Sequence, residues 1–291
     1  MQEKRRVGKD VMAEFDIKTK EVKLYSRGGT LWRNWLERAA IPRREIRSIQ
    51  VIEGPVYLPE DASGIIGNHY YLFGGIKNLK ELDMSGIDTS RTRDMSMMFC
   101  DCHSLTKLNM NGMDTSKVWN MRCMFQGCTC LTDLDLSGLD TSNVQGMSGM
   151  FEWCGLKHLR TGNINTSNVT DMSWMFAHCD RLEEIELKFD TSKVTSVINM
   201  FQDCAVRNLD LSNFNTSRIT HTRAMFERCE DLETLNLSGW NFSSVKDMSG
   251  MFSGCGKLRT LYMNPVTQEE SFTEDIFSEC SQDLEIINPE P

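Results

Sequence analysis

The sequence predicts a repeat solenoid of about eight coils, each 25–26 residues long. The first observation behind this prediction is a Met-Phe dipeptide that returns at a nearly fixed spacing and ends in a degenerate copy, Ile276-Phe277. The second is a cysteine three residues after each phenylalanine. A fixed period of this size is typical of stacked repeats that share one continuous core. The phenylalanines are Phe99, Phe125, Phe151, Phe176, Phe201, Phe226, Phe252 and Phe277, and the cysteines are Cys102, Cys128, Cys154, Cys179, Cys204, Cys229, Cys255 and Cys280.

Each repeat is expected to open with a short strand. In the copy over 131–155, Leu131, Leu134 and Leu136 have the spacing of a strand with one buried face. Stacking such coils brings the strands side by side. The sequence therefore predicts a parallel sheet of short strands along one face of the solenoid.

A corner is expected after each strand. Asp140, Thr141 and Ser142 are residue types that hydrogen-bond to the neighbouring backbone and stabilise turns. Because the triplet recurs along the chain, we interpret it as structural and not as catalytic. The other copies are Asp88-Thr89-Ser90, Asp114-Thr115-Ser116, Asn165-Thr166-Ser167, Asp190-Thr191-Ser192 and Asn215-Thr216-Ser217.

The end of each repeat has helical spacing. Met147, Met150, Phe151 and Cys154 fall at i, i+3, i+4 and i+7, which predicts a short helix of about two turns opposite the sheet. Cysteine behaves as a small buried hydrophobe, and the total of 11 cysteines is odd. We therefore expect a ladder of reduced, buried thiols, with sporadic oxidation as the alternative.

The two ends of the chain depart from the repeat, as terminal coils that cap a solenoid do. Residues 1–9 are expected to form a flexible basic N-terminus, and 10–75 an N-terminal cap made of a hairpin and a segment with Trp32 and Trp35. The repeats then occupy 76–263. Residues 264–291 form a degenerate last coil and C-terminal cap, closed by Pro289 and Pro291. Capped ends favour a monomer.

The charge of the chain disfavours nucleic acid as a partner. The net charge is −9, whereas phosphate binding needs a basic face. Residues 1–47 carry 13 Lys/Arg and 7 Asp/Glu, so a basic entry segment precedes an acidic body. No apolar stretch is long enough to insert into a membrane, and the N-terminus lacks the apolar region of a signal peptide. We expect a cytoplasmic protein if the chain is full length.

The repeat pattern resembles a known family. The run LDLSGLDTSNV over 134–144, followed by MSGMF, is similar to the BspA-like leucine-rich repeats, also described as DUF285 or the surface protein 26-residue repeat. The resemblance covers roughly Asn78 to Cys280. It implies a leucine-rich-repeat solenoid, often bacterial and surface-displayed or secreted, with proposed roles in adhesion.

The outward residues of the predicted strands form the first candidate binding surface. This strand face is polar and largely acidic, and concave solenoid surfaces are often used for recognition. A solvated face without a partner is the alternative, and a row of carboxylates that holds Ca²⁺ is another, although no EF-hand loop is present. The candidate residues are Asp133, Asp135, His158, Arg160, Glu184, Glu186, Asp210 and Tyr262.

Tryptophans form the second candidate surface, on the side of the predicted helices. Trp153 and Trp174 replace small or polar residues of the repeat, so we expect them to face outward as an interaction patch. The alternative is that each ring packs over its own coil, which we favour for Trp119.

The remaining reactive residues do not form a catalytic or metal-binding motif. The histidines His69, His103, His158, His178 and His221 have no zinc-ligand spacing, and no phosphate loop or nucleophile elbow is present. Outside the ladder, Cys100, Cys123 and Cys130 are expected to be the accessible cysteines. The sequence therefore predicts a protein that is not an enzyme and needs no cofactor or metal: a protein-protein interaction scaffold of the bacterial surface or adhesion type, or alternatively an intracellular binding module such as an effector, inhibitor or sensor.

Overall fold

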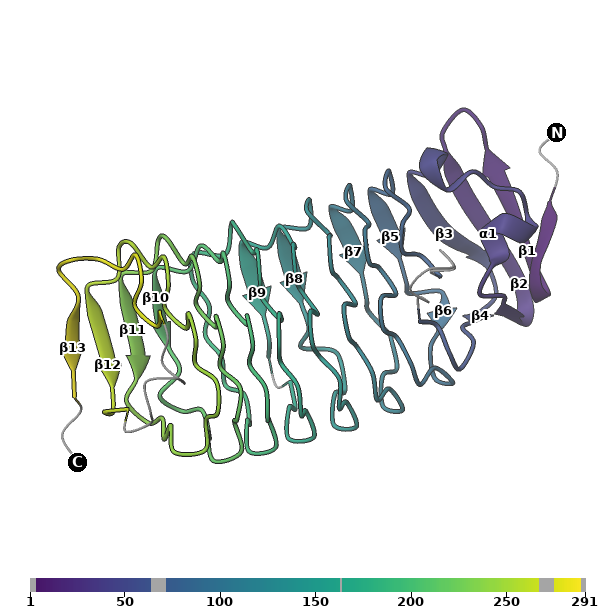
Figure 1. Cartoon of the computed structure of the whole chain (residues 1–291). Helices are drawn as coiled ribbons and strands as arrows, with labels where there is room; N and C mark the ends of the chain where they lie inside the picture. Colours follow the sequence, from purple (N-terminus) through teal and green to yellow (C-terminus); the bar gives the residue numbers. More distant parts are fainter. Residues whose placement is uncertain (1–3, 64–71, 163, 267–274, 289–291) are drawn as a thin grey trace.

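A computed structural model describes residues 4–63, 72–162, 164–266 and 275–288 of the chain. The coils stack along one axis, with a hairpin at the N-terminal end and strand β13 at the other (Figure 1). This arrangement is the predicted solenoid. His69, Pro289 and Pro291, which the sequence analysis singled out, lie outside the described residues.

The N-terminal cap begins with the predicted hairpin. Strand β1 (Arg5–Asp16) pairs antiparallel with β2 (Glu21–Leu31), and β2 in turn pairs parallel with β3 (Ser48–Glu53) and starts the sheet of the solenoid. The prediction of a flexible segment over 1–9 is wrong for the strand residues, because Val7 is fully buried in this hairpin. The remaining elements of the cap are α1 (Trp35–Arg38), a 3-10 helix (Arg43–Glu45) and β4 (Val56–Tyr57).

The coils contribute short parallel strands to one face, as predicted. Equivalent leucines lie in register from coil to coil, for example Leu134 with Leu159 and Leu235 with Leu261. Among the described residues the ladder is interrupted twice, between β7 and β8 and between β9 and β10. The strands are β5 (Glu81–Asp83), β6 (Ile87–Asp88), β7 (Lys107–Asn109), β8 (Asp133–Asp135), β9 (His158–Arg160), β10 (Asn208–Asp210), β11 (Thr234–Leu237), β12 (Thr260–Met263) and β13 (Glu285–Ile287).

The opposite side is built from tight turns, so the prediction of two-turn helices is wrong. Met150 N donates to Met147 O at 3.2 Å and Cys154 N to Phe151 O at 3.0 Å, but Phe151 N and Trp153 N donate to carbonyls of the next coil. Gly149 and Trp153 have φ of 63° and 56°, in the left-handed region. A left-handed residue at every fourth position prevents an α-helix, since a left-handed conformation breaks its backbone geometry. Two consecutive turns thus produce the spacing that was interpreted as helical.

The core of the turn side is a column of stacked phenylalanines. Nine rings from Phe73 to Phe277 form eight consecutive pairs with centroids 5.2–6.1 Å apart. Phe73 adds a rung to the eight predicted from the sequence, so the estimate of about eight coils is low.

The cysteine ladder runs beside the phenylalanine column. All 11 cysteines are free, and most of the ladder thiols are buried. They donate to backbone carbonyls of the preceding coil, as Cys179 Sγ does to Phe151 O at 3.2 Å and Cys229 Sγ to Phe201 O at 3.0 Å. The predicted ladder of reduced, buried thiols is confirmed.

The corners use the Asp-Thr-Ser triplet as predicted. Asp140 Oδ1 accepts from Ser142 N at 2.9 Å and closes the turn. Thr141 Oγ1 is buried and donates to Asn165 O of the next coil at 2.9 Å. The aspartate or asparagine therefore shapes each corner, while the threonine joins it to its neighbour.

Candidate functional site

The strand face brings the predicted acidic and basic residues into two parallel rows. Strands β8 and β9 place Asp133 beside His158 and Asp135 beside Arg160. Glu184 and Glu186 continue the two rows in the next coil, and Asp210 and Tyr262 extend the second row. All of these side chains are exposed except that of Tyr262, which is half-buried. The sequence-based choice of outward residues on this face therefore holds in the structure.

One coil of this face, 183–188, contains no strand. Within the part of the chain that the structure describes, the backbone of 184–186 makes no hydrogen bond, and the coil is joined to its neighbour by Arg207 N, which donates to Glu183 O at 3.1 Å. The cause lies in the sequence: Lys188-Phe189 stands between Leu187 and Asp190, where the copy over 131–155 has three residues, 137–139. The shortened connection lacks the Asp-x-Ser turn that follows β8 and β10. The strandless coil was not predicted, although the missing residue is visible in the sequence.

Two shallow hollows flank the strandless coil. The larger, of about 800 Å³, lies between β9 and this coil and includes Lys157, Arg181 and Glu183. The smaller, of about 530 Å³, lies between this coil and β10–β12 and includes Lys188, Asn213 and Tyr262. The two hollows share Ile185, Glu186 and Asn208. Together they form a continuous depression centred on 185–186.

Charge is distributed unevenly along the strand face. Near the cap, Lys107 Nζ pairs with Glu81 at 2.8 Å. At the depression, Arg207 pairs with Glu183 at 3.2 Å and Lys188 with Glu186 at 2.9 Å. Within the described residues, Glu184 has no such ion pair. Its carboxylate is thus available to a partner.

Two of the predicted acidic residues also serve the fold. Ser137 N donates to Asp135 Oδ1 and Ser212 N to Asp210 Oδ1, both at 2.9 Å. Hydrogen bonds from these serines lower the pKa of both carboxyl groups, so both are ionised at neutral pH. Asp135 and Asp210 therefore combine a turn-forming role with the negative charge of the face.

The turn side presents three tryptophans on adjacent coils. The side chains of Trp119, Trp153 and Trp174 are 48%, 53% and 38% exposed. Trp119 was expected to pack over its own coil, but its exposure matches that of the other two. Trp153 stacks on His178 with ring centroids 3.9 Å apart, and His178 in turn lies 3.5 Å from Asp203. The rings of Trp153 and His178 are therefore ordered against each other at the surface.

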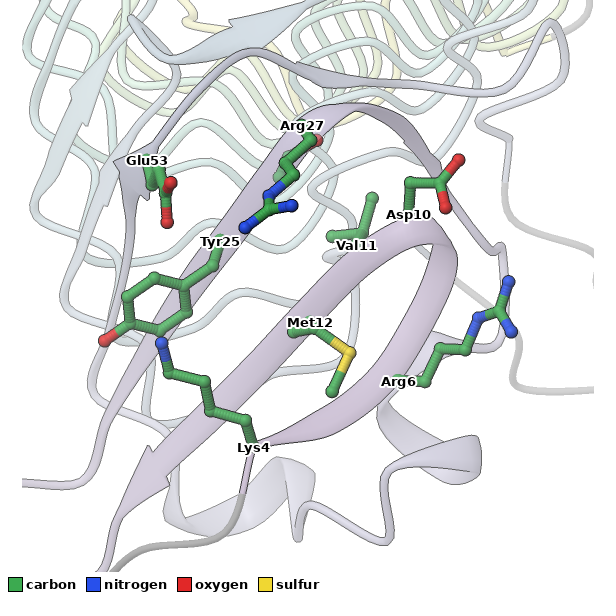
Figure 2. A pocket seen from close by; sticks show the side chains of 9 residues that line it. Lys4, Arg6, Asp10, Val11, Met12, Tyr25, Arg27 and Glu53 are labelled. Atoms are coloured by element: carbon green, nitrogen blue, oxygen red, sulfur yellow. The ribbon is translucent and has the colours of Figure 1, made fainter.

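A further hollow of about 580 Å³ lies on the N-terminal hairpin and was not predicted. Figure 2 shows Lys4 beside the ring of Tyr25, with Arg6 and Arg27 at other edges of the hollow. Lys4 Nζ lies 3.4 Å from the centroid of the Tyr25 ring. This hollow is lined by three basic side chains together with the carboxylates of Asp10 and Glu53, unlike the largely acidic strand face.

The accessible cysteines differ in part from the prediction. Cys130 is exposed and Cys123 is partly exposed, but Cys100 is buried. Burial raises the pKa of Cys123 to about 11, so its thiol is neutral at physiological pH. Cys130 alone of the three combines exposure with an ordinary environment within the described structure.

Over the described ranges, no three His, Cys, Asp or Glu side chains gather closely enough to hold a metal ion. Over the same ranges, no helix has the length and apolar character needed to cross a membrane.

Solved structures with related architecture are leucine-rich repeat proteins of bacteria. A leucine-rich repeat protein from Bacteroides ovatus is 15% identical, with 97% of this chain and 78% of that chain covered and a TM-score of 0.35. A leucine rich cell surface protein from Faecalibacterium prausnitzii is 13% identical, with 94% and 98% covered and a TM-score of 0.29. A leucine-rich repeat protein from Eubacterium ventriosum is 12% identical, with 100% and 97% covered and a TM-score of 0.35. Scores this low support no argument about function.

Sequence comparison identifies the family. No curated protein matches the chain significantly. The family model described as "Mycoplasma protein of unknown function, DUF285" matches residues 67–157 and 155–264, which together make up most of the chain. These matches span the same coils that carry the repeat. The chain therefore belongs to the DUF285 family, as its resemblance to the BspA-like leucine-rich repeats predicted.

Proposed function

We propose that this protein is a non-catalytic protein-protein interaction scaffold, displayed on a bacterial surface in an adhesion-type role, and that it binds its partner across the strand face. The observation that carries the proposal is the depression centred on 185–186. Among the described residues the ladder of this face is also interrupted between β7 and β8, but the backbone groups of 184–186 make no hydrogen bond and line a depression. Unpaired strand-like backbone is a template for binding an extended segment of another chain.

The charges around the depression favour a partner with a basic segment. Glu183, Glu184 and Glu186 come from the strandless coil, and Asp210 lies in the following strand. His158 and Arg160 border the depression on the other side. Charges at the rim of an interface mainly determine which partner binds and how fast, more than the total affinity. The larger hollow also includes Lys157 and Arg181, so the complement of this surface is a basic segment that contacts the carboxylates and avoids these two cations and Arg160.

The test is a charge reversal on the strand face. We expect Glu184→Lys combined with Glu186→Lys to weaken binding to an extracellular-matrix protein by at least about tenfold, because both substitutions oppose a basic partner. Binding is measured by biolayer interferometry against a panel of purified matrix proteins. The matched control is Glu230→Lys, an exposed carboxylate on the turn side.

Two results contradict the proposal. One is a double variant that keeps its circular dichroism spectrum and binds as tightly as the parent chain. The other is complete protection of the protein when intact cells of the source organism are treated with protease, which would place it inside the cell and favour an internal binding module.

A further inference from the structure

Two of the exposed tryptophans lie at left-handed positions of the repeat, each one coil after a glycine. The residue that precedes Trp153 by one coil is Gly127, and the residue that precedes Trp174 by one coil is Gly149. Gly127 N donates to Glu152 O at 2.8 Å, which fixes this coil-to-coil alignment. No side chain at the equivalent position of the preceding coil therefore covers either ring. We call these the glycine-tryptophan pairs, Gly127–Trp153 and Gly149–Trp174.

Both tryptophans have a backbone conformation that is unfavourable for their side chains. Trp153 has φ of 56° and Trp174 has φ of 62°. For a residue with a Cβ, the left-handed region costs roughly 1–2 kcal/mol relative to the right-handed one. Burial does not repay this cost, because much of each ring is in contact with solvent. Equivalent positions in the other coils are also left-handed, so the repeat sets this conformation, and the large exposed ring at each position is what points to a function.

The structure fixes the backbone of both tryptophans and orders the ring of Trp153. Trp153 N donates to Ala177 O and Trp174 N to Ile198 O, both at 2.9 Å, so each backbone is tied to the next coil. One face of the Trp153 ring is stacked on His178, at an interplanar angle of 13°. The other face is therefore directed to the preceding coil, where the equivalent residue is Gly127. A rigid aromatic platform loses little entropy when a ligand binds.

A carboxylate accompanies each glycine. A Cβ placed on Gly127 would lie 2.7 Å from Asp101 Oδ1, and one placed on Gly149 would lie 3.4 Å from Glu152 Oε2. Gln126 Nε2 donates to Glu152 Oε2 at 2.6 Å. Each glycine-tryptophan pair thus combines an apolar ring face with a hydrogen-bond acceptor, and the pair with Glu152 has an amide next to it.

A charged bridge lies on one side of Trp174, between the positions that Trp119 and Trp174 occupy in the repeat. Arg122 Nη2 lies 3.5 Å from Asp171 Oδ2, although the two residues belong to coils that are separated by the coil of Gly146. A Cβ on Gly146 would lie 3.0 Å from Arg122 Nε, so the glycine leaves the room for this contact. Ionic groups therefore separate the Trp119 position from the two glycine-tryptophan pairs, and the three exposed rings do not form one continuous apolar patch.

From these observations we propose that the glycine-tryptophan pairs bind a saccharide chain, with sugar rings stacked on Trp153 and Trp174. A pyranose has an apolar face of C–H groups that fits an aromatic ring, and hydroxyl groups at its edge that both donate and accept hydrogen bonds. Asp101 and Glu152 accept from such hydroxyls. A protein partner fits less well, because charged residues are depleted from the core of protein interfaces, whereas a carboxylate lies beside the glycine of each pair.

The experiment replaces the rings without straining the backbone. The full chain is screened on a glycan array that contains chitohexaose, cellohexaose and sialylated and fucosylated mucin-type oligosaccharides. The strongest ligand is then titrated by isothermal calorimetry. Trp153→Gly combined with Trp174→Gly should weaken binding by at least about tenfold, which corresponds to 1.4 kcal/mol or more. Glycine accepts positive φ, so this variant should remain folded.

Two variants serve as controls. Trp119→Ala removes an equally exposed ring that has Arg93, and not glycine, one coil earlier, and it should leave saccharide binding unchanged. Glu184→Lys with Glu186→Lys should also leave it unchanged, because the strand face is a separate surface. The outcome for saccharides is therefore independent of the proposed protein partner.

Three outcomes would overturn the saccharide proposal. The first is no binding to any glycan on the array. The second is binding that the double glycine variant retains, or that Trp119→Ala reduces equally. The third is the absence of glycan binding, together with weaker binding of the double glycine variant to a purified matrix protein. This result would assign the same rings to a protein partner.

Discussion

The inward and outward rows of this solenoid are built by the same coils but follow different rules. Inward rows repeat one residue type from coil to coil, as the phenylalanine column and the cysteine ladder do. Outward rows change at every coil: the row that starts at Asp133 continues with His158 and Glu184. An inward side chain must match the one above and the one below, whereas an outward side chain needs to match neither. Deviations among the outward residues are therefore where binding specificity is expected.

The two outward faces differ from each other as well. On the strand face the backbone is extended and accepts any side chain, so variation there costs little. On the turn side, positions with positive φ favour glycine, so a tryptophan at such a position is costly. An unusual residue on the turn side is therefore stronger evidence for a function than an unusual residue on the strand face.

The largest expected effect is alkaline destabilisation through the cysteine ladder. Burial raises the pKa of Cys102, Cys154, Cys204 and Cys255 to about 12, from an ordinary value of 9.0. Below about pH 9 these thiols are neutral in both states, and stability is unaffected. Above it, the unfolded chain releases protons that the folded chain keeps, so each thiol lowers the free energy of unfolding by about 1.4 kcal/mol per pH unit. Urea denaturation under reducing conditions between about pH 8 and pH 11 measures the sum.

Two variants separate the contribution of the cysteine ladder to this pH dependence of stability. Cys154→Ala removes one buried thiol and should reduce the slope of stability against pH above pH 9 by about 1.4 kcal/mol per unit. Cys130→Ala removes an exposed thiol and should leave the slope unchanged. Equal slopes of stability against pH in the two variants would show that the cysteine ladder does not cause the loss of stability at alkaline pH.

A smaller but still large effect is expected from the phenylalanine column. Phe176→Ala removes a fully buried ring with stacked neighbours on both sides and should lower the free energy of unfolding by about 3–5 kcal/mol. Phe277→Ala is the control, because that ring is partly exposed and, in the described structure, stacks on Phe252 alone. A similar loss in both variants would mean that position in the column does not matter.

Much of the inward architecture was predictable from the sequence. The strands, the corners and the cysteine ladder followed from residues that recur from coil to coil. Inward residues at the same position of successive coils stack on one another and become buried, so a periodic residue type indicates a buried position. The hairpin over 15–26 followed from alternation. Phe73 was the exception among inward residues, because Ile76 stands where its coil would have a cysteine.

The turns that were mistaken for helices show what periodicity misses. Met147, Met150, Phe151 and Cys154 face the core whether the backbone forms a helix or two consecutive turns. The backbone signal lies in the outward residues, and those with positive φ include Cys123, Trp174, Asp203 and Arg228 as well as glycines. Without a consistent glycine, the sequence did not reveal the left-handed positions.

The candidate site was predictable in its composition but not in its shape. The outward residues of the strands were identified correctly from alternation. The depression was not, because it results from one missing residue between Leu187 and Asp190 that removes a turn and opens the backbone. The glycine-tryptophan pairs were also missed, since they join residues from neighbouring coils that are about 25 positions apart in the sequence.

The smallest expected effect isolates the cost of positive φ, on which the interpretation of the turn side depends. Gly250 has φ of 62°, and a Cβ added there would meet only Ser253 Cβ, at 3.9 Å. Because space is available, Gly250→Ala should lower the free energy of unfolding by about 1 kcal/mol through backbone conformation alone. Gly138 is outside the left-handed region and an added Cβ would meet no atom within 4 Å, so Gly138→Ala should be neutral or slightly stabilising. If chemical denaturation shows no difference between the two variants, positive φ carries no cost on the turn side. Trp153 and Trp174 would then no longer be strained residues that call for a functional explanation.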